Sequence, residues 1–126
     1  MSKLFLYTPR ILAGIMMLLF GLDKLFPFMP HPPAAEAGIL FKSALVATGY
    51  FFKFVGLCEI FVGLAFISGY FVPIALLVMA PLCVNFILYH IFLDPANIAG
   101  ALFVTAVCLF LTWQNWEIFK PLVKPR

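Results

Sequence analysis

The segment FVPIALLVMAPLCVNFILYHIFL, residues 71–93, contains no acidic side chain and no basic one except His90. About 20 apolar residues in a helix are enough to cross the hydrocarbon core of a bilayer. An uncharged run of this length is typical of a membrane-spanning helix and longer than the apolar runs inside soluble domains. The segment therefore predicts a chain that folds in lipid.

The composition of the whole chain supports this prediction. Of its 126 residues, 65% are hydrophobic and only 10% are charged, whereas soluble proteins carry about 25% charged residues. So few polar groups cannot cover a surface in water, and we expect one integral membrane domain over residues 1–126. The net charge of +3 comes from scattered Lys and Arg without a basic stripe, so no nucleic-acid partner is expected.

Four apolar segments predict four membrane spans. They cover about residues 6–26, 52–70, 71–93 and 98–116. Residues 27–38, PFMPHPPAAEAG, are expected to form an exposed loop, and residues 39–50, ILFKSALVATGY, are too short to span and predict an interfacial helix. The expected fold class is all-α: an integral membrane four-helix transmembrane bundle with a short interfacial helix between spans one and two.

The remaining connections predict tight turns. Gly69 and Pro73 in SGYFVP favour a hairpin between spans two and three, and the Asp-Pro pair in LDPANIAG favours a turn in which Asp94 caps a helix. The alternative for the N-terminus is a signal peptide ending in AEA at Ala37. That site lies far beyond the apolar core, so we interpret the first segment as a true span.

The distribution of basic residues favours cytoplasmic termini. With four spans both termini lie on one side, which carries five Lys and Arg residues against three on the other side. The two sets are Lys3, Arg10, Lys120, Lys124 and Arg126, and Lys24, Lys42 and Lys53.

Spans one and two each carry a stripe of glycine at helical spacing. Gly14 and Gly21 share a face with Arg10 and Lys24 in the first span. In the second, Gly56 and Gly63 share a face with Glu59. Glycine lets helix backbones approach closely in lipid, so these four glycines are expected at helix packing contacts.

Glu59 is the one carboxylate in the middle of a predicted span. A charged side chain there costs at least about 2.5–3.5 kcal/mol, so Glu59 must be protonated or paired. Its candidate partners are Asn85, His90, Lys24 and Arg10. It could tie spans two and three together by a hydrogen bond, or it could line a polar pocket or proton path. His90 and Asp94 are one turn apart and could hydrogen-bond to each other.

The cysteines give no further site at this stage. Cys58, Cys83 and Cys108 lie in three different apolar segments, and no Cys-x-x-Cys pair occurs. Neither a disulfide framework nor a dithiol redox centre is therefore predicted, and no metal-binding cluster is recognisable.

Ordered motifs along the chain resemble those of the DoxX-like family of small four-span bacterial membrane proteins. They are FGLDKL at 20–25, the segment from Thr48 to Leu76, and VNFILYHIFLDP at 84–95. The family pattern implies as key positions Arg10, Gly21, Lys24, Gly49, Glu59, Gly63, Asn85 and His90. The resemblance also implies the bacterial inner membrane and, through members similar to the membrane subunit of a thiosulfate:quinone oxidoreductase, a quinone as candidate ligand.

Our first functional hypothesis is an accessory subunit of a membrane redox system that holds a quinone or similar lipophilic ligand near Glu59. Asn85 would orient the ligand, and His90 with Asp94 would connect it to the aqueous edge. Arg10 and Lys24 would reach in from the helix ends. Thiosulfate chemistry would need another subunit, so a membrane or peripheral redox partner is expected.

Two hypotheses of other classes remain open. One is a small-molecule or lipid carrier, or a permeation unit, formed by homo-oligomerisation. The other is a structural scaffold that holds a membrane partner. The sequence leaves open the ligand, the partner, the oligomeric state, and whether the protein is itself an enzyme.

Overall fold

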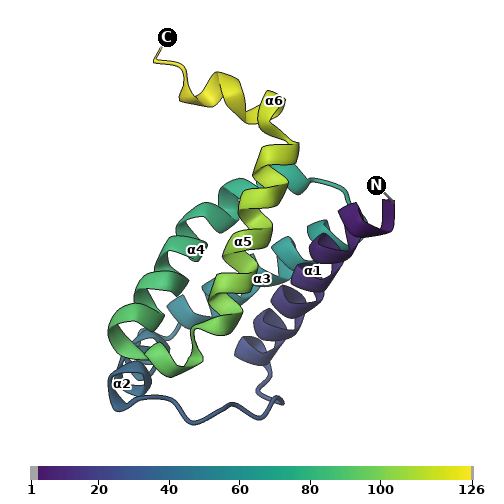
Figure 1. Cartoon of the computed structure of the whole chain (residues 1–126). Coiled ribbons are helices and arrows are strands. Elements are labelled where there is room, and N and C mark those ends of the chain that lie inside the picture. The colour runs from purple at the N-terminus through teal and green to yellow at the C-terminus, as the bar shows by residue number, and fades with distance from the viewer. Residues whose placement is uncertain (1–2, 126) are drawn as a thin grey trace.

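The chain folds into antiparallel helices, which a computed structural model describes for residues 3–125. Four long helices lie along a common axis, each antiparallel to the one before it, and the shorter helix α2 lies across their lower end (Figure 1). The elements are α1 (Lys3–Leu25), α2 (Glu36–Ala47), α3 (Phe51–Ser68), α4 (Val72–Leu93), η1 (Pro95–Asn97), α5 (Ala99–Gln114), α6 (Trp116–Phe119) and η2 (Lys120–Val123). The described part of the chain contains no strand, which confirms the all-α prediction.

Three helices, α1, α3 and α4, are each long and apolar enough to cross a membrane. They begin and end within a few residues of the predicted spans. The fourth predicted span is shorter than expected, because α5 has 16 residues and a length of about 24 Å, against a hydrocarbon core of about 30 Å. It passes the same test only together with Trp116–Val123, from which it is bent by 78°.

Asn115 explains the bend after α5. Its side-chain amide donates to the Leu111 carbonyl at 2.8 Å, and its backbone N–H donates to the same carbonyl at 3.0 Å. The side-chain bond adds a second donor to a carbonyl that the last helical N–H already pairs. The helix ends at this residue, and the bend to Trp116–Val123 follows it.

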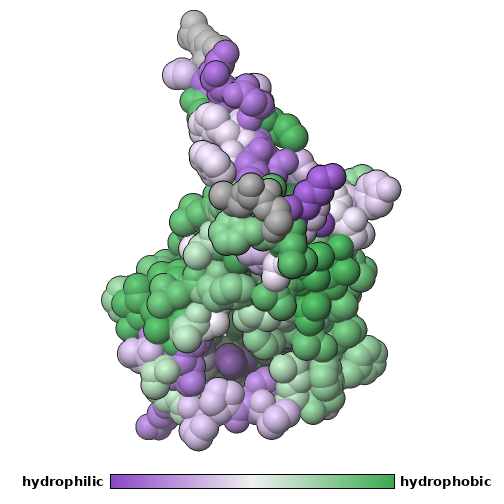
Figure 2. Space-filling view, turned by 45° about the vertical axis from the view of Figure 1, so that its right-hand side comes forward, coloured by the Kyte–Doolittle hydropathy of each residue, from purple (hydrophilic) through white to green (hydrophobic). Residues whose placement is uncertain are grey.

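The surface pattern matches a helical bundle in lipid. Hydrophobic side chains cover the middle of the molecule, and hydrophilic ones gather at its lower end and on the C-terminal segment (Figure 2). Large apolar side chains such as Leu77, Leu88 and Leu109 are about half or more exposed on α4 and α5. Figure 2 also shows a hollow at the lower end, with hydrophilic atoms at its floor.

Helices α1 and α3 pack through reciprocal glycine contacts. A Cβ added to Gly21 would lie 2.6 Å from the Gly56 carbonyl oxygen, and one on Gly56 would lie 3.0 Å from that of Gly21. Gly63 and Gly14 have the same relation, at 2.8 and 3.0 Å. Only glycine allows backbones to approach this closely. The two contacts therefore fix the register of α1 against α3.

The hairpin between α3 and α4 has the predicted turn residues. Gly69 ends α3 with φ 82° and donates its N–H to the Ala65 carbonyl at 2.9 Å. Phe71 follows with φ 60°, and Pro73 lies in the first turn of α4. Positive φ at two of three residues reverses the chain within a few residues.

Candidate functional site

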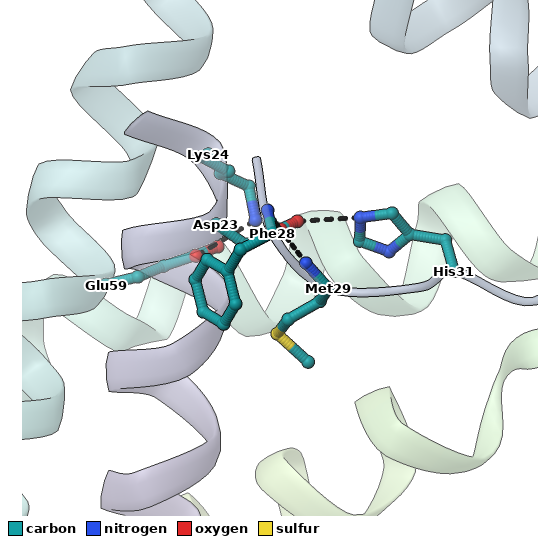
Figure 3. Close-up of polar contacts among 6 residues, drawn as sticks. All are labelled: Asp23, Lys24, Phe28, Met29, His31 and Glu59. Atoms are coloured by element: carbon teal, nitrogen blue, oxygen red, sulfur yellow. Dashed lines mark hydrogen bonds and ion pairs between the residues drawn. The ribbon is translucent and has the colours of Figure 1, made fainter. Parts of the chain in front are cut away.

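Glu59 forms an ion pair with Lys24 inside the bundle (Figure 3). Lys24 Nζ donates to Glu59 Oε2 at 2.9 Å, and the side chains are 20% and 1% exposed, respectively. The pair joins α3 to α1. Of the four candidate partners, Lys24 is therefore the one that reaches Glu59, so its hydrogen bond ties spans one and two rather than spans two and three; the alternative of a polar pocket stays open.

Gly56 makes room for the lysine side chain. A Cβ on Gly56 would meet Lys24 Cβ at 3.0 Å and Cδ at 3.7 Å, so the aliphatic stem of Lys24 lies along the bare backbone of α3. The ammonium group lies 5.5 Å from the centre of the Phe52 ring. Within the described residues Glu59 is its one hydrogen-bond partner, so part of its three-donor capacity is free for a ligand.

Asp23, next to Lys24, organises the loop that follows α1. We call residues 26–35 the strap. One carboxylate oxygen of Asp23 accepts the N–H groups of Phe28 and Met29 at 2.9 and 2.8 Å. The other lies 2.7 Å from His31 Nε2. Asp23 is 8% exposed and His31 is 60% exposed, so a buried carboxylate holds the start of the strap (Figure 3).

Asp94 and Asn97 hold the other end of the strap. Asp94 Oδ1 accepts the Ala35 N–H at 3.3 Å, and its Oδ2 accepts the Asn97 side-chain amide at 2.9 Å. Asn97 also donates to the Pro33 carbonyl at 3.1 Å. Asp94 therefore pins the strap to the turn after α4. It occupies the predicted cap position, at the end of α4 and the start of η1, but its side chain makes no capping hydrogen bond to η1.

The environment of Asp94 stabilises its charged form. The Asn97 amide, followed by the Ala35 N–H, lowers the pKa of this carboxyl, although partial burial acts in the opposite direction. His90 lies close by, but its Nδ1 donates to the Asp94 backbone carbonyl at 3.0 Å. His90 and Asp94 are therefore in contact, as predicted, but through the backbone carbonyl of Asp94. The Asp94 carboxylate remains available to accept the hydrogen bond from the strap.

Helix α2 covers the same end of the bundle. Its Gly38 is buried, and a Cβ there would lie 2.5 Å from the Tyr89 hydroxyl, so α2 lies directly on α4. The Tyr89 hydroxyl is buried and has no hydrogen-bond partner. Lys42 Nζ lies 5.4 Å from the centre of the Tyr89 ring.

Lys42 is a further charged residue at this end of the bundle. Burial of part of its side chain lowers the pKa of Lys42, and repulsion by Lys24 adds to this effect. The carboxylates of Asp94, Asp23 and Glu59 act on it in the opposite direction. We call the charged residues of this end of the bundle the polar cluster; they are Asp23, Lys24, Lys42, Glu59 and Asp94.

Two predicted site residues lie away from the polar cluster. Arg10 is at the other end of α1, where its Nε donates to the Phe66 carbonyl in the last turn of α3 at 2.8 Å. A cation is favourable at a helix C-terminus, so Arg10 serves the end of α3. Asn85 is exposed on α4 and has no hydrogen bond within the described residues. It makes no hydrogen bond to Glu59, and its role in orienting a ligand stays a prediction.

The structure also brings together two cysteines that the sequence keeps apart. Cys83 on α4 and Cys108 on α5 are buried and line the same groove between the two helices. All three cysteines are free thiols. The sequence contains no Cys-x-x-Cys motif, as noted above, and helix packing places Cys83 and Cys108 on the lining of one groove.

Sequence reasoning missed Asp23, His31, Lys42, Asn97 and Tyr89 as parts of this region. For Asp23 a signal was present, because it is adjacent to Lys24 at the end of a span. The polar cluster contains ammonium donors and carboxylate acceptors, and its carboxylates are buried. Among residues 3–125 no group of three or more His, Cys, Asp or Glu is arranged to hold a metal ion.

Comparison with known families agrees with this architecture. The DoxX family model matches residues 5–92, which include α1 to α4 up to its last turn and both members of the Lys24–Glu59 pair. The chain belongs to the DoxX family. It is therefore a multi-pass membrane protein, as its apolar helices independently indicate. No curated protein and no solved structure matched the chain.

Proposed function

We propose that this DoxX-family protein is an accessory subunit of a redox system in the bacterial inner membrane, and that it binds the head of a quinone-type lipophile at the Lys24–Glu59 pair. The observation that supports this most directly is the pair itself. An ion pair with one fully buried partner inside apolar helices is costly to maintain, and ionisable groups in such places usually serve a function.

The donor set fits a carbonyl-bearing ring. Lys24 has unused N–H donors and is partly exposed, so its ammonium can donate to a carbonyl oxygen while it still bonds Glu59. Phe52 adds an aromatic face next to the ammonium. A bound quinone would supply two-electron, two-proton chemistry at this place.

The chain's own residues would bind the ligand and hold a proton. Lys24 orients the ring through its ammonium, and Glu59 Oε2 accepts a hydrogen bond from Lys24 or from a ligand hydroxyl. Asp23 and Asp94 hold the strap over this end of the bundle, which limits the access of water. A partner protein would deliver or collect the electrons.

The proposed orientation follows from the basic residues at the chain ends. Cytoplasmic termini would place the strap, α2 and the polar cluster on the periplasmic side. The reason is that the N-terminus of α1 and the C-terminus of α5 lie at the opposite end of the bundle (Figure 1). The redox partner would then meet the protein at the periplasmic surface.

The test is direct identification of the ligand. Wild type would be purified in nanodiscs, extracted with organic solvent and analysed by mass spectrometry for quinone per mole of protein. Glu59→Gln and Lys24→Met would be compared with matched controls at exposed positions, Glu117→Gln and Lys53→Met. We expect near-stoichiometric quinone in wild type and controls and at least a tenfold loss in the two site variants.

Folding would be checked by circular dichroism and size exclusion, so that loss of ligand is not confused with loss of structure. If a site variant fails to fold, the shift in thermal midpoint of wild type on addition of decylubiquinone replaces it. Phospholipid alone in the wild-type extract, with no thermal shift on quinone addition, would refute the proposal. If Glu59→Gln contained as much quinone as wild type, the quinone would bind at a site that does not include Glu59.

A further inference from the structure

Cys83 and Cys108 occupy facing positions on the two helices that lie side by side in Figure 1, α4 and α5. Their relative exposures are 6% and 8%, and both side chains line one groove between the two helices. A disulfide needs Cβ atoms about 3.5–4.5 Å apart and an S–S bond of about 2.05 Å. Cysteines on adjacent helices that line the same groove can meet this geometry by a shift of one helix against the other.

A groove gives access to the two thiols from the lipid side. It has a volume of about 430 Å³, and both cysteines line it. Its rim includes Val84, Leu88 and Leu109, which are 60%, 47% and 68% exposed on the apolar surface. An apolar reagent dissolved in the bilayer can therefore reach sulfur atoms that water-soluble reagents cannot.

Thr105 adds a polar group to the groove. Its hydroxyl lies in the lining, is buried, and has no hydrogen-bond partner. Buried hydroxyls in helices normally bond a backbone carbonyl one turn earlier. An unpaired hydroxyl in the groove that both cysteines line is placed to stabilise negative charge on sulfur while a thiol loses its proton.

We propose that Cys83 and Cys108 form a reversible disulfide across α4 and α5, oxidised from the lipid by a quinone-class two-electron acceptor that enters this groove. The two thiols give up two electrons and two protons as the S–S bond forms. The acceptor takes up both and leaves as the hydroquinone, and a dithiol reductant restores the two thiols. This site shares no residue with the Lys24–Glu59 pair and does not rest on it.

The experiment counts free thiols in the full-length protein in nanodiscs. Reduced protein would be incubated with decylubiquinone, whose fully substituted ring blocks addition of a thiol to carbon. It would then be denatured, labelled with N-ethylmaleimide and weighed intact. We expect three labels before oxidation and one after it, on Cys58, with a Cys83–Cys108 peptide and about one hydroquinone formed per protein. Three labels after oxidation would overturn the proposal, as would a disulfide that includes Cys58.

Variants separate the proposed chemistry from simple packing. Cys83→Ser and Cys108→Ser should each keep two labels after decylubiquinone, and oxidised glutathione in water should leave all three labels on wild type. Equal oxidation by glutathione would contradict access through the groove. Thr105→Val should slow disulfide formation at least threefold without changing the final yield, and an unchanged rate would refute its role as a positioning residue. Glu59→Gln should form the disulfide normally, whether or not it binds quinone.

Discussion

Replacing Gly21 by alanine should separate α1 from α3. The added Cβ would lie 2.6 Å from the Gly56 carbonyl oxygen, about 0.8 Å short of the 3.4 Å at which ordinary contact begins. Two further atoms, Ile60 Cγ1 and Ile60 N, would lie at 2.8 and 2.9 Å. Two of the three obstructing atoms are backbone, so no side-chain rotation removes the clash, and the helices must move apart.

The expected cost follows from two opposing effects. Overpacking a close contact costs about 1–3 kcal/mol, and a backbone clash belongs at the upper end of that range. Alanine recovers about 0.5–1 kcal/mol because it is a better helix former than glycine. We therefore expect Gly21→Ala to lower the free energy of unfolding by about 2 kcal/mol.

The matched control is Gly100→Ala on α5, where the nearest atom to the new Cβ is Met16 Cε at 3.9 Å. This variant should be as stable as wild type or more stable by at most about 1 kcal/mol. Reversible unfolding in mixed micelles of rising dodecyl sulfate content, followed by circular dichroism, measures both. If Gly21→Ala unfolds at the same detergent composition as wild type, the close approach of α1 and α3 is refuted.

Three further predictions concern charged and polar side chains. Lys24→Met should lower the free energy of unfolding by about 3–5 kcal/mol, because it leaves the Glu59 carboxylate buried alone, and the double variant with Glu59→Gln should recover most of this loss. Asp94 stabilises the fold above its ordinary pKa of 3.8, because its pKa is lowered in the folded state. The thermal midpoint should therefore fall as the pH drops below about 4, and Asp94→Asn should reduce this dependence, with Asp23 contributing the remainder. Asn85→Leu should weaken self-association about threefold to thirtyfold in a liposome energy-transfer assay, because an amide exposed to lipid gains about 0.6–2 kcal/mol by bonding a second copy.

Each of these predictions has an outcome that contradicts it. A double variant no more stable than Lys24→Met would show that the two charges do not depend on each other. Equal acid sensitivity of wild type and Asp94→Asn would show that the charge of Asp94 does not stabilise the strap. Unchanged energy transfer in Asn85→Leu, with Ser43→Leu on exposed α2 as control, would argue against a second copy at this face.

The helices and their closest contact could be predicted from sequence because lipid imposes simple rules. Length and hydropathy locate α1, α3 and α4, and glycines seven residues apart mark the faces that meet. The hairpin also followed from Gly69 and Pro73. In each case the signal lies within one segment of sequence.

The polar site was harder to predict because it depends on which face of each helix turns inward. Helical spacing placed Asn85 on a face of α4 but could not show that this face is exposed. Lys24 was only one of four candidate partners for Glu59, since its reach depends on the space left by Gly56. The groove that Cys83 and Cys108 line brings together residues of different helices, and nothing in their spacing indicates it.

The position of Glu59 also constrains how the chain enters the membrane. Glu59 is the ninth of the 18 residues of α3, so this helix carries its carboxylate inside its apolar length. Inserted alone, α3 would meet a penalty of about 2.5–3.5 kcal/mol. During synthesis, however, α1 precedes it with Lys24 at its end. The first helix therefore acts as an insertion aid for the third, and loss of Lys24 should appear in cells as failed insertion of α3 before any effect on a finished protein is seen.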